Sequence, residues 1–213
     1  KPGGTTTVED GTFNGSIGSG FPYKLDITGG TYDDTDGVQD YLPDGYTTNE
    51  SGQVIPATDP GEDSVASVMR NGVIQYFDTL PGAIDAAGNG NTVTLLKDVQ
   101  VEEVISIPED DDFVLNLGGY TLTLSGTKQV TDAQSGFSSS AALINHGAVG
   151  IENGTISFSS ASSHGIVNTG SLTVASNATI SGTATEYSNT SVIANIGGTL
   201  TTAGTLESTA NHG

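Results

Sequence analysis

The chain of 213 residues contains no cysteine and no tryptophan, and only five Lys and Arg residues stand against 25 Asp and Glu. The missing cysteine excludes a disulfide framework and a thiolate metal site. So few cationic side chains cannot build a phosphate-binding surface, and we expect no nucleic-acid partner. No apolar run reaches the roughly 18 residues of a membrane-spanning helix, so we expect no membrane insertion.

The formal net charge of −20 reflects a shortage of Lys and Arg rather than an excess of acid, because charged residues make up only 14% of the chain. A typical soluble domain has about 25%. The carboxylates therefore lack internal cationic partners, and Ca²⁺ is the one cofactor that the composition leaves open. No secretory signal is visible and the sequence opens directly at Lys1. We therefore expect a mature or excised fragment.

Three C-terminal stretches repeat one pattern, at residues 141–158, 164–181 and 191–208. Each holds an asparagine, then a glycine two residues later, then a Gly/Ala-Thr-aliphatic step. The asparagines are Asn145, Asn168 and Asn195, and the glycines are Gly147, Gly170 and Gly197. The runs between them are short and rich in β-branched residues, as in strands. Three short strands in every 23 to 27 residues indicate one coil of a parallel β-solenoid.

This pattern predicts an all-β protein whose main part is a right-handed parallel β-helix. A single coil cannot bury its inward side chains, but coils stacked about 4.8 Å apart form a continuous core. Leu143, Ile166 and Ile193 then form one aliphatic stack. We assign the three repeated asparagines to a structural ladder, because amides at a repeated turn can hydrogen-bond along the stack.

Alternation of apolar and polar residues predicts the first coils upstream, with strands at residues 92–99, 104–107, 113–117 and 120–124. We place the β-helix domain at residues 61–213. Residues 125–140 are rich in Gly, Ser, Gln and Thr and are expected to form a loop that bulges from one coil. Such a loop is the best place for function on this part of the chain.

One helix is predicted, at residues 80–87, capped by Asp78 or Thr79 and ending at Gly88. Its aliphatic face is expected to cover the open end of the solenoid and to hide unpaired strand edges. Residues 67–76 predict a β-hairpin whose type I′ turn is Asn71-Gly72. The hairpin and the capping helix together occupy residues 65–88.

Residues 1–60 differ from the rest and predict a small N-terminal β unit. Two Gly-Thr-aromatic steps occur there, at residues 11–13 and 30–32. They are expected to be the end of a preceding β-helix or part of a packed β module. The polar, turn-rich segment at residues 57–63 marks the boundary.

Three segments resemble the entry segment of pectate-lyase-like right-handed β-helix proteins: residues 77–87 (FDTLPGAIDAA), 91–99 (NTVTLLKDV) and 105–124 (ISIPEDDDFVLNLGGYTLTL). Such segments are frequent in large surface and adhesin-like proteins of gut Gram-positive bacteria. Residues 27–46 (ITGGTYDDTDGVQDYLPDGY) resemble the unit that closes one β-helix in these proteins. The resemblance implies the end of one β-helix, a junction and the start of the next, in a protein that is secreted or held at the cell surface. The same fold hosts lyases and hydrolases, so it does not decide the activity.

No catalytic residue is assigned. A polysaccharide lyase needs a base beside a carboxylate-bound Ca²⁺, and Lys97 and Lys128 have only isolated acids near them. A glycoside hydrolase needs two facing carboxylates roughly 5 to 9.5 Å apart. The acids of the repeats do not align with one another; they are Glu152, Glu186 and Glu207.

The acidic cluster Asp33, Asp34 and Asp36 is the weak candidate for a Ca²⁺ site, because with Gly37 it imitates half of an EF-hand loop. Tyr32 stands at the first ligand position of that loop, so the full calcium loop is absent. The second acidic cluster, at residues 109–112, is expected to be a solvated turn.

Three tyrosines are the weak candidates for a ligand site: Tyr32, Tyr41 and Tyr46. Their rings could stack on a sugar, although anchoring the N-terminal unit is the commoner use of such rings. The histidines are expected to be solvated turn residues; they are His146, His164 and His212.

Three functions remain open. The first is a non-catalytic adhesin or stalk module at the bacterial cell surface, whose partners are host or microbial glycans or surface proteins. The second is a fragment of a carbohydrate-active β-helix enzyme, a lyase or a hydrolase. The third is a filament subunit that associates end to end, with the coil near residues 200–206 stacking on the N-terminal strands of the next copy.

Overall fold

The computed structural model describes residues 5–15, 24–43, 45–49, 51–57, 60–70, 73–131, 138–158, 164–185 and 191–211. Within these residues strands predominate and two helices are present. The larger sheets are built mainly from parallel strands. The prediction of a mostly β protein with parallel sheets is confirmed at this level.

An N-terminal unit contains six short strands and one helix: β1 (Thr5–Val8), β2 (Thr12–Phe13), β3 (Lys24–Ile27), β4 (Thr31–Tyr32), α1 (Thr35–Gln39), β5 (Tyr46–Thr48) and β6 (Val54–Pro56). β1 pairs with β3 and β2 with β4, both in parallel. Thr12 lies opposite Thr31 and Phe13 opposite Tyr32, so the two Gly-Thr-aromatic steps stack. β5 and β6 form an antiparallel pair. The core of the unit consists of Ile27, Tyr32, Val38 and Val54.

A hairpin and a helix follow: β7 (Ala66–Arg70), β8 (Val73–Phe77) and α2 (Leu80–Ala87). β7 and β8 are antiparallel as predicted, whereas the predicted turn residues Asn71 and Gly72 lie outside the described part of the chain. The predicted helix is confirmed. Thr79 is its N-cap, because its hydroxyl accepts a hydrogen bond from the backbone N–H of Gly82 (3.2 Å). The aliphatic face of α2 is buried in the main core of the protein.

The remaining strands are β9 (Asn91–Leu95), β10 (Val99–Val101), β11 (Ile105–Ile107), β12 (Asp112–Asn116), β13 (Thr121–Leu124), β14 (Lys128–Thr131), β15 (Ser138–Asn145), β16 (Ala148–Glu152), β17 (Gly154–Phe158), β18 (His164–Asn168), β19 (Ser171–Val174), β20 (Ala178–Thr185), β21 (Ser191–Asn195), β22 (Thr199–Thr202) and β23 (Thr205–Asn211). They form three sheets, ordered β22-β19-β16-β12-β9-β7-β8, β10-β13-β17-β20-β23 and β11-β15-β18-β21. Apart from β14, the chain visits the three sheets in rotation. We call each passage through the three sheets a coil.

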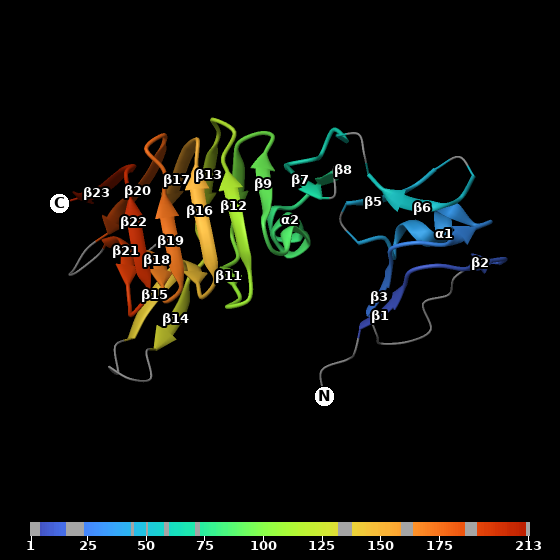
Figure 1. Ribbon diagram of the computed structural model, residues 1–213, viewed down its shortest axis with the longest axis horizontal. Helices are drawn as coiled ribbons and strands as arrows, with labels where there is room; N and C mark the ends of the chain where they lie inside the picture. Colours follow the sequence, from blue (N-terminus) through green and yellow to red (C-terminus); the bar gives the residue numbers. More distant parts are fainter. Residues whose placement is uncertain are drawn as a thin grey trace.

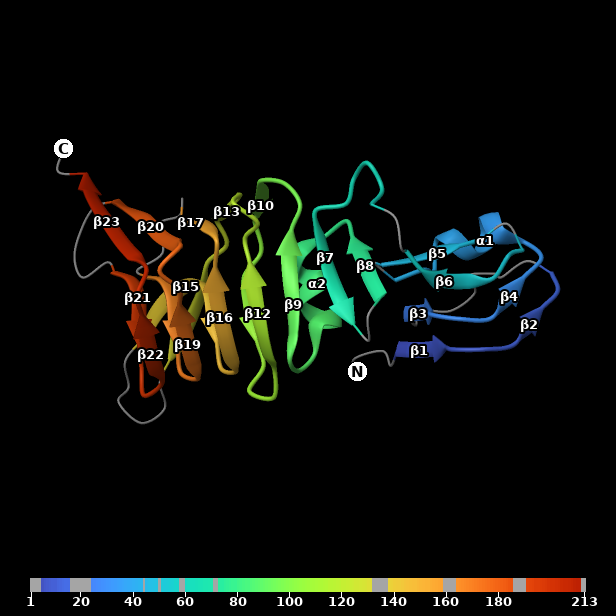
Figure 2. The same ribbon diagram turned by 45° about the horizontal axis from the view of Figure 1, so that its top comes forward.

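The coils lie side by side along one axis (Figure 1). In the turned view, α2 lies beside β7 and β9 at one end of the row, and the N-terminal unit lies beyond β8 (Figure 2). β7 and β8 continue one of the sheets but run antiparallel, so the regular parallel order starts at β9.

The register between coils follows the sequence repeats. Asn145 pairs with Asn168, which pairs with Asn195. The Gly/Ala-Thr-aliphatic steps of β17, β20 and β23 also lie one above the other. The predicted aliphatic stack is present too, formed by Leu143, Ile166 and Ile193. Each inward-facing aliphatic side chain of an inner coil is therefore covered from both sides, which explains the near-complete burial of the core.

One glycine of the repeat was aligned incorrectly. Ser171 pairs with Thr199, so the position below Gly170 is taken by Gly198 and not by the predicted Gly197. A Cβ atom on Gly198 would lie 2.4 Å from the carbonyl oxygen of Gly170. The turn between β21 and β22 is one residue longer than the turn between β18 and β19. Gly197, with a φ of 76°, is the additional residue.

Two further predictions are wrong in detail. Residues 92–99 do not form one strand, because the chain turns a corner after Leu95 and enters a second sheet at Val99. The predicted loop at residues 125–140 contains strands at both of its ends: β14 pairs with β15 in antiparallel order, from Lys128 opposite Ala141 to Thr131 opposite Ser138, while residues 132–137 lie outside the described part of the chain. The sequence of β14 does not alternate between apolar and polar residues, so it was not predicted as a strand. Backbone hydrogen bonds pair it with β15, and such bonds do not depend on the side chains.

Candidate functional site

The repeated asparagines form a hydrogen-bonded ladder in the coils. The Asn145 amide donates to Asn168 Oδ1 (2.7 Å), and the Asn168 amide donates to Asn195 Oδ1 (2.6 Å). The same amides also donate to carbonyl oxygens of the next coil, that of Asn145 to Ser171 in β19 and that of Asn168 to Thr199 in β22. Asn145 and Asn168 are fully buried. This arrangement holds the coils together and leaves the amides no room to bind a ligand.

The ladder has one unsatisfied end. Oδ1 of Asn145 is buried and has no hydrogen-bond partner among the described residues. In the preceding coil the residue paired with Asn145 is Ile107, whose side chain has no polar group. The ladder therefore begins at Asn145 with an orphaned acceptor.

The expectation of solvated turn histidines is wrong for His164. This residue lies in β18, is only 7% exposed and places Nδ1 2.7 Å from the hydroxyl of Ser191. Burial lowers the pKa of His164 below its ordinary value, and a hydrogen bond with the backbone of Ser191 opposes that shift. His146 is exposed, with Nδ1 2.7 Å from the Thr169 hydroxyl. His212 lies outside the described residues.

The proposed calcium residues serve the local backbone. Asp33 Oδ1 accepts a hydrogen bond from the N–H of Gly15 (2.8 Å), and Asp34 caps helix α1 by accepting from the N–H of Gly37 (3.1 Å). Asp36 lies in the first turn of that helix. The described residues contain no group of three or more His, Cys, Asp or Glu side chains that could hold a metal ion. Asp34 therefore stabilises the N-terminus of α1, and Asp33 connects the residues that follow β4 to those that follow β2.

The lysines considered for catalysis lie on different parts of the chain. Lys97 stands at the corner between β9 and β10 and donates to the carbonyl oxygen of Glu62 (3.1 Å). Lys128 begins β14. Glu152 and Glu207 belong to two different sheets, in β16 and β23, and Glu186 lies outside the described residues.

Tyr32 is an anchor of the N-terminal core. Its side chain is only 3% exposed, and its ring stacks on Phe13 with the ring centroids 4.8 Å apart. Its hydroxyl donates to the carbonyl oxygen of Gly29 (3.2 Å), and burial raises its pKa above the ordinary value. A ligand cannot reach this ring, so we place Tyr32 outside any binding site.

Tyr41 and Tyr46 lie instead where the N-terminal unit meets the hairpin β7–β8. Contacts between described residues join the two parts. The side-chain amide of Gln75 donates to the carbonyl oxygen of Gly45 (3.3 Å), and the Tyr76 N–H donates to the carbonyl oxygen of Ala57 (3.1 Å). Gly45, with a φ of 82°, packs so closely on Phe77 that a Cβ atom would lie 2.6 Å from its ring.

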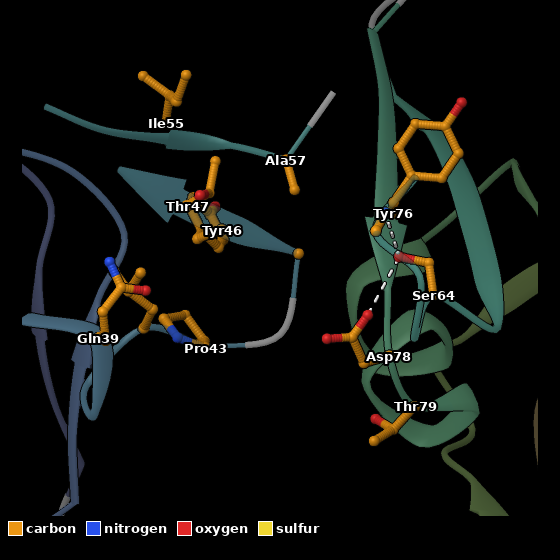
Figure 3. A pocket seen from close by; sticks show the side chains of 13 residues that line it. Gln39, Pro43, Tyr46, Thr47, Ile55, Ala57, Ser64, Tyr76, Asp78 and Thr79 are labelled. Atoms are coloured by element: carbon orange, nitrogen blue, oxygen red, sulfur yellow. Dashed lines mark hydrogen bonds between the residues drawn. The ribbon is translucent and has the colours of Figure 1, made fainter. Parts of the chain in front are cut away.

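Beside these contacts is a cavity of about 830 Å³, which we call the junction cavity (Figure 3). The N-terminal unit contributes Gln39, Leu42, Pro43, Gly45, Tyr46, Thr47, Ile55 and Ala57; the other side contributes Gly61, Ser64, Tyr76, Asp78 and Thr79. Figure 3 shows Tyr46 and Thr47 on one wall and Ser64, Tyr76 and Asp78 on the other.

A second cavity, of about 790 Å³, shares Leu42, Pro43 and Tyr46 with the first. Its lining includes four charged side chains, those of Asp26, Asp40, Asp85 and Arg70. Tyr41 contributes the second aromatic ring here.

Sequence reasoning found Tyr46 but missed Tyr76, Asp78 and Gln39. Tyr76 alternates like any residue of a half-buried strand, and Asp78 was considered only as a helix cap. The predicted boundary at residues 57–63 was a usable signal, because ligand cavities occur preferentially where two units of a chain meet.

No known protein family, no curated protein and no solved structure matches this chain. Among the described residues, no helix combines the length and the apolar character needed to cross a membrane. The site is therefore interpreted from its own chemistry.

Proposed function

We propose that residues 61–213 form a right-handed parallel β-helix and that the chain is a non-catalytic module of an extracellular bacterial surface protein, acting as an adhesin or a stalk. The N-terminal unit then precedes this β-helix as the end of another one or as a packed module.

The observation that carries the proposal is the in-register stacking of the coils. The strands of three sheets follow one another in rotation, and parallel crossovers of this kind are right-handed in about 98% of cases. Backbone hydrogen bonds between coils run along the axis of such a stack, so the module keeps its length under load.

The surface chemistry also favours an extracellular role. Outward positions of the coils carry small polar side chains, such as Ser171, Thr173 and Thr201. The chain has no cysteine and a net charge of −20, which keeps such a surface soluble and disfavours non-specific contact with anions.

Intact cells of the source organism provide the test. An antibody against the purified chain should label unbroken cells, and external proteinase K should remove the label. Labelling that appears only after lysis would overturn the surface assignment.

The alternatives have tests of their own. The purified chain is expected to release no unsaturated or shortened oligosaccharide from a panel of plant and microbial polysaccharides; release would establish the enzyme alternative. It is expected to sediment as a monomer, and concentration-dependent rods in electron micrographs would establish the filament alternative.

A further inference from the structure

We propose that the junction cavity binds a neutral oligosaccharide, with the rings of Tyr46 and Tyr76 as apolar platforms and the carboxylate of Asp78 as the acceptor for sugar hydroxyls. This inference deepens the proposed adhesin function by naming a ligand class and a place.

The cavity is preformed. Its two walls are joined by the Gln75–Gly45 and Tyr76–Ala57 hydrogen bonds and by the close packing of Gly45 on Phe77. Its volume of about 830 Å³ falls within the usual range of ligand pockets, roughly 300 to 1,000 Å³. A site whose walls are already fixed loses little entropy when it binds.

The polar groups of the cavity are oriented by buried partners. Ser64, only 6% exposed, accepts a hydrogen bond from the N–H of Gly61 (3.1 Å) and donates one to Asp78 Oδ1 (3.1 Å). The carboxylate of Asp78 is exposed at the cavity wall, as Figure 3 shows. Hydrogen bonds to an ionised acceptor are about twice as strong as neutral ones, so a positioned carboxylate suits ligand hydroxyls.

The apolar part of the lining matches the carbon-bound faces of a sugar ring. Tyr46 and Tyr76 are half-buried and come from opposite walls. Such rings combine a large apolar surface with a polar tip. On the N-terminal wall the amide of Gln39 and the hydroxyl of Thr47 add neutral polar groups.

Charge selects among possible ligands. No Lys, Arg or His is among the described residues that line the cavity, and the whole chain carries −20. A phosphate or a uronate would meet one carboxylate and no cation. A basic peptide would find more carboxylates in the second cavity, where Asp26, Asp40 and Asp85 lie beside Arg70. A hydroxyl-rich neutral ligand fits the junction cavity best.

The test is calorimetric titration of the purified chain with maltotriose, cellotriose, mannotriose and lactose, beside trigalacturonate and trilysine. We expect saturable binding of at least one neutral saccharide and none of trigalacturonate. Tyr76→Ala should weaken that binding at least tenfold. Asp78→Asn should weaken it several-fold, and Tyr76→Phe should retain most of it. Melting curves verify that each variant folds.

Tyr120→Ala is the matched control, because this tyrosine is 38% exposed on the coils and lines neither cavity. Its affinity should equal that of the unaltered chain. The proposal is overturned if no neutral saccharide binds, if trilysine or trigalacturonate binds in preference, or if neither Tyr76→Ala nor Asp78→Asn changes the affinity. Such a result would leave the surface display of the chain untouched, since antibody labelling of intact cells tests it separately.

Discussion

The N-terminal unit and the coil region use the same device, parallel strands stacked in register, but they differ in how many layers they stack. The N-terminal unit pairs two Gly-Thr-aromatic steps, and Phe13 on the first of them is still 36% exposed. In the coils, Ile156 and Ile180 occupy comparable step positions and are fully buried. In the described residues Phe13 has a stacked neighbour on one side only, whereas Ile156 lies between Leu122 and Ile180. Burial at these step positions therefore increases when both sides are covered.

The coil region shows the same rule within itself. Leu206 continues the stack of Ile156 and Ile180, yet it lies in the last described coil and is 39% exposed. At the opposite end the predicted cap is present, with α2 and the hairpin β7–β8 packed on the first coil. The N-terminal unit compensates for its few layers with the Phe13–Tyr32 ring stack and the antiparallel pair β5–β6.

The largest effect should come from the closest contact between coils. A Cβ atom on Gly170 would lie 2.1 Å from the carbonyl oxygen of Gly147, so Gly170→Ala must push two coils apart. We expect it to lower the free energy of unfolding by about 3 kcal/mol, at the upper end of overpacking effects. Urea unfolding measures it.

Gly197→Ala is the control, because a Cβ atom at Gly197 meets nothing within 4 Å and only the φ of 76° opposes the change. It should cost about 1 kcal/mol. Equal losses in the two variants would show that close stacking is not what Gly170 provides.

The next effect concerns the centre and the end of the asparagine ladder. Asn168 is fully buried and hydrogen-bonds to both of its neighbours, whereas Asn195 is exposed. Asn168→Ala leaves the buried Asn145 amide without a side-chain partner, and we expect a loss of about 2 kcal/mol. Asn195→Ala should cost about 0.5 to 1 kcal/mol. Thermal unfolding compares the two, and a larger loss for Asn195→Ala would contradict the ladder.

A smaller effect should be confined to the N-terminal unit. Phe13→Ala removes the ring stacked on Tyr32, and such a pair contributes about 0.5 to 1.5 kcal/mol beyond its buried area. Amide hydrogen exchange should become faster in residues 24–32 and stay unchanged in β16 to β20. Faster exchange throughout the coils would show that the two regions unfold as one.

The smallest effect is a pH dependence of the coil region. Because burial holds the pKa of His164 below its ordinary value, the unfolded chain binds a proton there more readily than the folded chain. The free energy of unfolding should therefore decrease as the pH falls below about 6.5. His164→Gln should flatten this slope between pH 7.5 and 5.5. Equal slopes in the variant and in the unaltered chain would contradict the assignment of this pH dependence to His164.

The coils could be predicted from the sequence because equivalent positions in successive coils have the same surroundings. The same residue types therefore recur at a regular spacing. Asn145, Asn168 and Asn195 lie in register for that reason. Prediction was wrong where an element has no repeated counterpart. β14 is an extra strand outside the rotation, and the extra residue before Thr199 shifts the close contact from Gly197 to Gly198.

The candidate site was predicted only in part, for a related reason. Tyr46 was found because three tyrosines cluster along the sequence, but its partner Tyr76 comes from a strand 30 residues later in the chain. Tyr32 belongs to the same cluster in the sequence, but its side chain is buried in the core of the N-terminal unit. Periodicity identifies neighbours within a stack and says nothing about contacts between two units.

Cysteine cross-linking tests the stacking register most directly, because the chain has no cysteine of its own. Thr173 and Thr201 are exposed and lie opposite each other in β19 and β22. Adjacent strands are about 4.8 Å apart, within the Cα separation of disulfides. Thr173→Cys/Thr201→Cys should form an intramolecular disulfide under mild oxidation, and Thr173→Cys/Gln100→Cys, on two different sheets, should not. The reverse outcome would contradict the stacked coils and the surface module built on them.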